Sequence, residues 1–411
     1  MKQLTFFRLN MLECVFAGLF FVLILFPKFT ALYIGVMILT VVYAYVKKQI
    51  KFQFSYGTIG FVLLYLAYLI GVIWTQDPKQ ANFYVVNKLV FLIFPFLLAI
   101  KKKDGFKLNI VLWGLISATL ISFLKGIIIG IPCYLIHHSM QYCFMRSYLS
   151  PVIHPTYMTV FAQFSFIALF HMRSKKVIKK SVFYILGILL VVYSLLLMSL
   201  SGILFLMFMV FAFLVWKAWK KLNRKLVLIG VPLLLVSFLL IAPKLPILKE
   251  EIESSKIALS HYIESPSNFI SNIPEIPSGS EVRLVMWTVS WEEITKHPLG
   301  IGTGNIDIYM GKNLRSRGMN WVADQEFNPH NQFLQTTLEV GFFGGLFLLL
   351  ILIFGFIDAK RIKSWALFFL FASLLLNSCF ESMLQHQSGI IFFPFMYMMY
   401  LIDFNSNKRL A

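Results

Sequence analysis

Residues 181–216 read SVFYILGILLVVYSLLLMSLSGILFLMFMVFAFLVW and contain no charged side chain. A helix needs roughly 17–25 apolar residues to cross the hydrocarbon core of a bilayer. The stretch is long enough for two such helices, and Ser201 lies where the chain would turn between them. We therefore expect two membrane spans, at about 181–200 and 202–216.

Ten further apolar runs of comparable length lie at about 9–26, 29–46, 56–74, 83–100, 108–131, 154–172, 226–242, 333–357, 365–380 and 389–402. Of the 411 residues, 59% are hydrophobic and 13% are charged, whereas soluble domains are about 45–50% apolar and about 25% charged. A soluble fold of this length could not bury so much apolar surface. The sequence therefore predicts an all-α, polytopic integral membrane protein with about 12 transmembrane helices.

The net charge of +19 indicates membrane topology. Of the 37 Lys and Arg residues, 24 lie in the two termini and in five short connections, at 47–51, 101–107, 173–180, 217–225 and 360–363. Basic residues gather at the cytoplasmic ends of spanning helices. Twelve spans with the N-terminus inside place all these segments on the cytoplasmic side, so we expect membrane lipids as partners and no nucleic acid. The N-terminal segment lacks a small-residue cleavage site, which favours an uncleaved first span.

One long polar segment interrupts the apolar pattern. This segment, residues 243–332, holds 11 of the 18 acidic residues, 8 basic residues and three of the eight His. Such a composition is typical of a water-facing loop. We divide the chain into spans 1–9 at 1–242, a large outer loop at 243–332, and spans 10–12 with a cytoplasmic C-terminus at 333–411. We expect 265–279, rich in Pro, Ser and Asn, to be irregular.

A helix is predicted in this loop over Glu281–Lys296, with Ser280 as its N-cap and His297-Pro298 at its end. Two faces are indicated by spacings of three and four: an apolar face of Val282, Val285, Met286 and Val289, and a second face of Arg283, Trp287 and Trp291.

The polar residues near the predicted membrane boundary are candidates for chemistry. His330 and Asn331 stand where the loop enters the tenth span, and a histidine there can accept a proton near neutral pH. A helix-capping or interfacial histidine is the alternative. The guanidinium of Arg283 matches the oxygens of a diphosphate, while a surface salt bridge to Glu281 or Glu292 is the competing interpretation. Arg315 and Arg317 leave the same two interpretations open.

Other features allow more than one interpretation. Glu339 and Glu381 lie in or beside predicted spans, where charges are costly, and could orient Arg or His from the loop or form plain interhelical hydrogen bonds. Cys133 and Cys143 could form a disulfide or be small apolar side chains in packed helices. The turn GIGTGN, residues 300–305, follows no predicted strand, which excludes a dinucleotide fingerprint. With no Walker A loop, HExxH or DxD-like pair, we expect no metal and no cofactor.

Several of these motifs, in this order, resemble the O-antigen ligase and polymerase superfamily of bacterial membrane glycosyltransferases. They are Arg283 through Trp287, His297-Pro298-Leu299-Gly300 with Gly302 and Gly304, His330-Asn331-Gln332-Phe333-Leu334, and Glu339-Val340-Gly341. His154-Pro155-Thr156-Tyr157 is similar to a pattern of relatives from Bacteroidetes. The resemblance implies a GT-C-like architecture with a large periplasmic loop, at the inner (cytoplasmic) membrane.

The resemblance also implies an activity. Family members transfer glycans from an undecaprenyl diphosphate carrier by metal-independent, inverting chemistry. Ligases use lipid A–core as acceptor, and polymerases use a second lipid-linked glycan. Arg283 matches the family's loop arginine and His330 its motif histidine, which implies catalytic roles for both. The expected substrate-binding residues are Trp287, Arg315, Arg317, Asn331, Arg146, Glu339 and Glu381.

One position departs from the family pattern. Many members carry a Ser-Arg pair at the outer start of span eight, where this chain reads Ser199-Leu200-Ser201-Gly202. Either Arg146, Arg315 or Arg317 takes the place of that arginine, or the donor is held differently. We favour the ligase type over the polymerase. A polysaccharide or lipid transporter is the alternative from another class, and it would predict functional charges at mid-membrane depth.

Overall fold

The computed structural model describes residues 10–221, 246–265, 269 and 278–407. The described helices that form the bundle are α2 (Met11–Leu25), α3 (Thr30–Val46), α4 (Ile59–Ile70), α5 (Pro78–Lys88), α6 (Val90–Leu97), α7 (Leu108–His137), α10 (Pro155–Ser174), α11 (Lys180–Leu196), α12 (Leu200–Lys221), α19 (Gln332–Arg361), α20 (Trp365–Ser378) and α21 (Gln387–Asn407). Outside the bundle lie the short helices α8 (Met140–Phe144) and α9 (Arg146–Leu149), and the loop helices α14 (Pro246–Glu264), α16 (Gly279–Lys296), α17 (Ile306–Ser316) and α18 (Asn320–Asp324). Strands β1 (Ile50–Phe52) and β2 (Ile100–Lys102) pair antiparallel.

The fold confirms an all-α polytopic membrane protein. Within the described residues, seven helical segments are long and apolar enough to cross a bilayer: Pro27–Val46, Tyr56–Trp74, Pro78–Leu97, Leu108–His137, Leu200–Ala218, Gln332–Arg361 and Gln387–Asn407. The apolar helices α2, α11 and α20 are shorter. Eleven of the predicted spans coincide with helices, while the ninth, 226–242, lies outside the described residues. The count of twelve stays a prediction.

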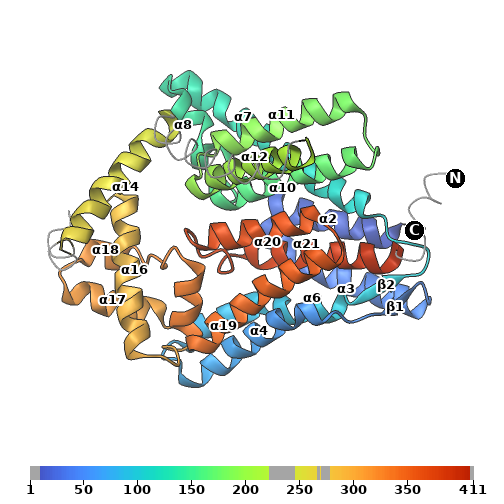
Figure 1. Ribbon diagram of the computed structural model, residues 1–411. Coiled ribbons are helices and arrows are strands. Elements are labelled where there is room, and N and C mark those ends of the chain that lie inside the picture. The colour runs from blue at the N-terminus through green and yellow to red at the C-terminus, as the bar shows by residue number, and fades with distance from the viewer. Residues whose placement is uncertain (1–9, 222–245, 266–268, 270–277, 408–411) are drawn as a thin grey trace.

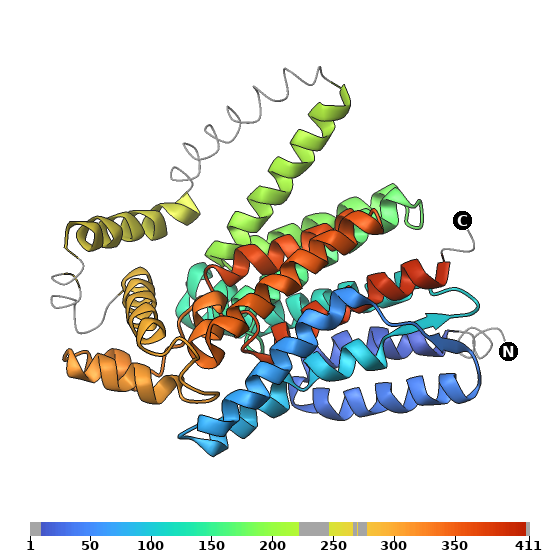
Figure 2. The same ribbon diagram turned by 60° about the horizontal axis from the view of Figure 1, so that its bottom comes forward.

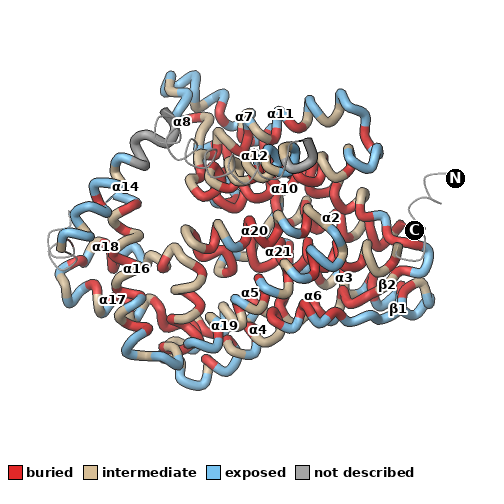
Figure 3. Tube along the Cα trace, viewed as in Figure 1, coloured by how far each residue is buried: buried red, intermediate tan, exposed pale blue. Residues whose placement is uncertain are grey.

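The helices separate into a bundle and an outer lobe. Figures 1 and 2 show α14, α16, α17 and α18 gathered at one end, with the start of α2, the end of α21 and the paired strands β1 and β2 at the opposite end. Buried residues concentrate along α10, α20 and α21 in the middle of the bundle (Figure 3). An even number of spans places both termini on one side of a membrane, so this arrangement agrees with the predicted topology. The boundaries 1–242, 243–332 and 333–411 remain predictions.

Helix α16 confirms the predicted apolar face, because Val282, Val285, Met286 and Val289 are all buried in the core of the outer lobe. The predicted N-cap was wrong. The helix is capped by Ser278, whose hydroxyl accepts from the Glu281 backbone N–H at 3.4 Å, while the Glu281 carboxylate accepts from the Ser278 N–H at 2.7 Å. This reciprocal capping box starts the helix two residues earlier. The irregular stretch predicted at 265–279 lies largely outside the described residues.

The GIGTGN turn joins the outer lobe to the bundle. Gly300, Gly302 and Gly304 all have positive φ, of +89°, +97° and +87°. The N–H of Gly302 donates to the Glu339 carbonyl at 3.0 Å, where α19 is interrupted at Val340 and Gly341. The turn therefore satisfies a carbonyl that the break in α19 leaves open. The N–H of Thr303 similarly donates to the Gly71 carbonyl at 3.0 Å, where α4 ends.

Replacement of Gly341 by Ala is expected to destabilise the protein. Gly341 has a φ of +73°, and an added Cβ would lie 2.4 Å from the Leu299 carbonyl carbon. The left-handed backbone alone costs about 1–3 kcal/mol for a residue with a side chain. The measurement is the unfolding temperature in detergent, with Gly35→Ala as the control. Gly35 lies in α3 with no atom within 4 Å of its added Cβ. Equal unfolding temperatures for the two variants would contradict the role of Gly341.

Cys133 and Cys143 form a disulfide, which decides between the two interpretations of this pair. The bond joins the last turns of α7 to α8, with the two Cα atoms 5.6 Å apart. Cys14 and Cys379 are free thiols.

Candidate functional site

A cavity of about 810 Å³ lies between the outer lobe and the adjoining ends of bundle helices. Its wall is built by the α8–α9 segment, the start of α10, residues 197–203, α14, α16 and the connection from α20 to α21. Among the described lining residues, the charged ones are Arg146, Arg283 and Glu381. Two arginines thus reach one cavity from elements far apart in the sequence. Such a site favours a ligand with several negative charges.

His330 lies beside this cavity and faces Glu381. Its Nδ1 is 3.4 Å from one carboxylate oxygen of Glu381 and 3.5 Å from the other. The backbone at His330 is left-handed, with a φ of +47°, and its N–H donates to the Asn328 side chain at 2.8 Å. A left-handed histidine is unusual and persists only where surrounding contacts hold it. The structure therefore fixes the imidazole next to the carboxylate.

The charge of Glu381 is set by its surroundings. Burial raises its pKa, but the hydrogen bond and charge of His330, together with the backbone N–H of Ser382 at 3.1 Å, outweigh burial and lower the pKa below the ordinary value. Glu381 is therefore an anion at neutral pH. When Nδ1–H of His330 donates to this anion, Nε2 is left as the proton acceptor.

Asn331 has a structural position directly after His330. Its side-chain oxygen accepts from the backbone N–H groups of Phe333 at 2.9 Å and Leu334 at 3.1 Å, which caps α19. Its side-chain nitrogen donates to the Cys379 carbonyl at 3.2 Å. These bonds connect the start of α19 to the end of α20. Asn331 therefore helps to hold the backbone on which His330 and Glu381 lie. It is not among the residues that line the cavity.

Two histidines were missed as site residues. His154 lines the cavity and caps α10, accepting at Nδ1 from the Thr156 N–H at 3.4 Å. His386 lies 5.6 Å from the Tyr157 ring, and burial lowers its pKa. Both lie close enough to Glu381 for their charges to interact. The HPTY motif at 154–157 could have indicated the first, whereas no sequence motif surrounds the second.

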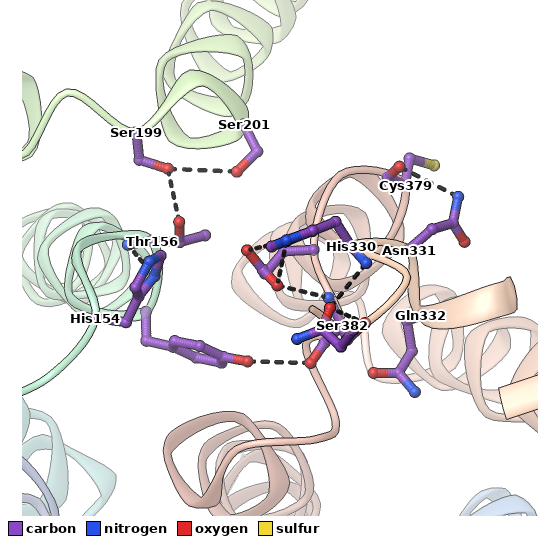
Figure 4. Close-up of polar contacts among 12 residues, drawn as sticks. His154, Thr156, Ser199, Ser201, His330, Asn331, Gln332, Cys379 and Ser382 are labelled. Carbon is purple, nitrogen blue, oxygen red and sulfur yellow. Dashed lines mark hydrogen bonds and ion pairs between the residues drawn. The ribbon is translucent and has the colours of Figure 1, made fainter. Parts of the chain in front are cut away.

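Hydroxyl groups line the wall opposite His330. The Ser199 hydroxyl lies 3.3 Å from that of Thr156 and 3.4 Å from that of Ser201. Figure 4 shows His154, Thr156, Ser199 and Ser201 on one side of the site, with His330 and Ser382 on the other. The wall where the resemblance leads us to expect an arginine is therefore lined by hydroxyl groups in this chain.

The packing of Gly202 explains the absence of that arginine. An added Cβ at Gly202 would lie 2.2 Å from Thr159 of α10, and the Gly202 carbonyl accepts from Gln163 at 2.6 Å. Helices α10 and α12 are therefore too close here to admit a side chain. An arginine at this position would require the two helices to move apart.

The three arginines considered as substitutes differ in position. Arg146 lines the cavity. Arg315 instead pairs with Asp324 at 2.7 Å, and Arg317 pairs with Glu292 and bonds to Asn313. Neither Arg315 nor Arg317 lines the cavity. Of the three, only Arg146 lines the same cavity as Arg283.

Replacement of Arg315 by Ala is expected to leave activity within about twofold of wild type, because an exposed ion pair contributes only about 0–1 kcal/mol. Its side chain and that of Asp324 are 54% and 62% exposed, and neither residue lines the cavity. A transfer assay on the purified variant measures this. A loss of more than tenfold would assign Arg315 to the substrate after all.

Glu339 lies in a separate buried cluster. Its carboxylate accepts from Gln335 at 3.1 Å, and the charge of Lys88 acts on it. Lys88 is fully buried, donates to Gln385 at 2.8 Å, and lies over the Tyr68 ring at 4.4 Å. Of the two acidic residues near the spans, Glu381 contacts the histidine and Glu339 does not. The cluster supports the connection that carries Glu381, because Gln385 belongs to the same segment.

Trp287 lies one helical turn after Arg283 on α16. Its ring nitrogen is buried without a hydrogen-bond partner among the described residues, and the side chain is not part of the cavity wall. The structure therefore brings together Arg283, Arg146, Glu381 and the neighbouring His330 out of the predicted residues. Asn331, Trp287, Glu339, Arg315 and Arg317 lie behind or away from the cavity.

Fold and site together define a multi-pass membrane protein with a cationic cavity beneath an outer lobe. Residues 185–349 match the family model described as O-antigen ligase. The predicted O-antigen ligase superfamily is confirmed over this segment, which contains Arg283 and His330. The match supports glycan transfer of the ligase or polymerase type in general, and a multi-pass bacterial membrane protein. No curated protein matches the chain.

Proposed function

We propose that this protein transfers a glycan from undecaprenyl diphosphate to an acceptor hydroxyl, at the periplasmic face of the bacterial inner membrane. The observation that carries the proposal is the convergence of Arg146, Arg283 and Glu381 on one cavity at the outer-lobe end of the bundle, with His330 beside Glu381. The family match supports the reaction class, and the apolar helices support a lipid-borne substrate.

The two arginines would hold the donor diphosphate. Guanidinium groups bind phosphate oxygens through two parallel hydrogen bonds, and they remain charged at any physiological pH. During transfer, the bond between the sugar C1 and the diphosphate oxygen breaks, and the electron pair stays on the diphosphate. Arg283 and Arg146 would stabilise that developing charge. Arg146 would thus take the part of the arginine that Gly202 excludes.

His330 would activate the acceptor. Its Nε2 would accept the proton of the acceptor hydroxyl as the oxygen attacks C1 from the face opposite the diphosphate, which inverts the anomeric configuration. Glu381 would hold the Nδ1–H tautomer and stabilise the imidazolium that forms. Neither step uses a metal or a cofactor.

The acceptor we propose is lipid A–core, as in a ligase. The same chemistry with a second lipid-linked glycan as acceptor would make a polymerase, because donor and leaving group are identical. A deletion strain complemented with wild type distinguishes the two, through gels of surface lipopolysaccharide and extracts of lipid-linked glycans. A ligase deletion accumulates long chains on undecaprenyl diphosphate and leaves lipid A–core bare. Lipid A–core carrying single repeats, with no long chains anywhere, would assign the protein as a polymerase.

A further inference from the structure

The segment that carries Arg146 is folded back against α7. After α7 ends at His137, α8 begins with Ser139 as its N-cap, and α9 begins at Arg146 itself. The Arg146 side chain is exposed and makes no ion pair or hydrogen bond with any described residue that would fix its direction. Its place in the cavity wall therefore depends on how the backbone of this segment is held.

Three contacts on one face of α7 hold that backbone. Gly126, Gly130 and Cys133 are spaced by four and three residues, so they share a helix face. An added Cβ at Gly126 would lie 2.2 Å from the Leu149 carbonyl, and one at Gly130 would lie 2.8 Å from the Cys143 carbonyl. The third contact is covalent, the disulfide from Cys133 to Cys143. Arg146 lies between the two attached points, Cys143 and Leu149.

The backbone at Arg146 is in a disfavoured conformation. Its φ is +54°, in the left-handed region that residues with a side chain rarely adopt. Such a conformation persists only where the surrounding structure determines it. Cys143 is fully buried at one end of the strained segment, and Leu149 is fully buried at the other. Of these two attachments, only the one at Cys143 is a covalent bond.

We infer that the Cys133–Cys143 disulfide positions Arg146 in the cavity wall, so that binding of the donor diphosphate depends on this bond being intact. Cys133 and Cys143 are positioning residues, since they act through Arg146 and touch no substrate. With the bond open, the segment keeps its packing at Gly126 but can relax at Arg146. The inference rests on the proposed function, because it assigns the diphosphate to Arg146.

The test is steady-state transfer by the purified full-length protein, with the lipid-linked glycan varied at fixed acceptor. The Cys133→Ser/Cys143→Ser double variant is expected to lose about tenfold in kcat/KM for the donor, since small misplacements of a binding group reduce rate by up to 10²-fold. The KM for the acceptor should not change. Cys14→Ser is the matched control, because it replaces a free thiol in α2 that does not line the cavity.

A double-mutant cycle with Arg146→Ala isolates the positioning role. In the Arg146→Ala background, removal of the disulfide should cause no further loss. A full tenfold loss in that background, or wild-type kinetics of the double cysteine variant, would overturn the inference. If Arg146→Ala alone retains wild-type kinetics, the proposed donor site is wrong. This result differs from one in which Arg146→Ala loses activity but removal of the disulfide has no effect, which would refute only the positioning role.

If the double cysteine variant does not fold, chemical reduction of the folded wild-type protein tests the same inference. Dithiothreitol supplies two electrons and two protons, opens the disulfide to two thiols, and is itself oxidised to its cyclic disulfide. The wild type should lose donor kcat/KM to the same extent as the variant, while size-exclusion elution shows that it remains folded. The Arg146→Ala protein should not respond. A response of equal size in both proteins would refute the positioning role.

Discussion

Replacement of His330 by Ala is expected to reduce glycan transfer by about 10²–10⁴-fold, the range in which a general base contributes to a rate. The reason is geometric. A Glu381 carboxylate oxygen lies 3.4 Å from Nδ1 of His330, which leaves Nε2 to take the proton from the acceptor hydroxyl. Donor binding should be little changed, because the arginines are intact. The measurement is kcat and donor KM of the purified variant, with its folding checked by size-exclusion elution.

Glu381→Gln is the companion to this variant. Because the pKa of Glu381 is held below its ordinary value, the side chain is charged at neutral pH, and the glutamine removes that charge while keeping the shape. We expect a loss at the lower end of the same range, about 10²-fold, entirely in kcat. Wild-type kcat in His330→Ala would show that the histidine has no part in the chemical step and only a structural place before α19.

Replacement of Arg283 by Lys is expected to lower kcat/KM for the donor by about 10²–10³-fold, as is typical for removal of one donor to a developing anion. Lysine keeps the positive charge but lacks the planar fork that binds two phosphate oxygens at once. The same substitution at Arg146 should give a loss of the same kind. Competition by inorganic diphosphate measures the site directly, and both variants should show weaker inhibition than wild type.

The matched control is Arg315→Lys, since Arg315 is an exposed arginine of the outer lobe that pairs with Asp324 outside the cavity. It should retain both its kinetics and its inhibition by diphosphate. If Arg283→Lys behaves like this control, Arg283 is a surface residue of α16, and the leaving group is stabilised elsewhere.

The fold could be predicted largely from local pattern. Uninterrupted apolar length determines where helices cross the bilayer, and the three- and four-residue spacing in 282–289 determined which face of α16 is buried. The prediction of the N-cap failed because Ser278 and Ser280 are both suitable residue types. The decision depends on Glu281 reaching back to the Ser278 backbone, a geometry that residue type alone does not specify.

The site was harder to predict because its parts meet only in three dimensions. His330 and Glu381 are 51 residues apart, and nothing local to either residue pairs them. Likewise, the sequence does not distinguish Arg146, Arg315 and Arg317, since each carries one positive charge. Only the fold shows that Arg315 forms an ion pair with Asp324, and Arg317 with Glu292. In the sequence, Gly202 is an isolated departure from the expected family pattern. The structure explains it, because Thr159 lies too close to Gly202 to leave room for a side chain.

The proposed reaction cleaves the bond between a glycan and undecaprenyl diphosphate. The most direct measurement uses protein reconstituted in vesicles with lipid-linked glycan and lipid A–core, and quantifies free undecaprenyl diphosphate by mass spectrometry. We predict that wild type releases it in step with glycosylated acceptor, and that His330→Ala releases none. Movement of intact lipid-linked glycan across the vesicle membrane, without any release of undecaprenyl diphosphate, would contradict the proposed transfer reaction and indicate a transporter.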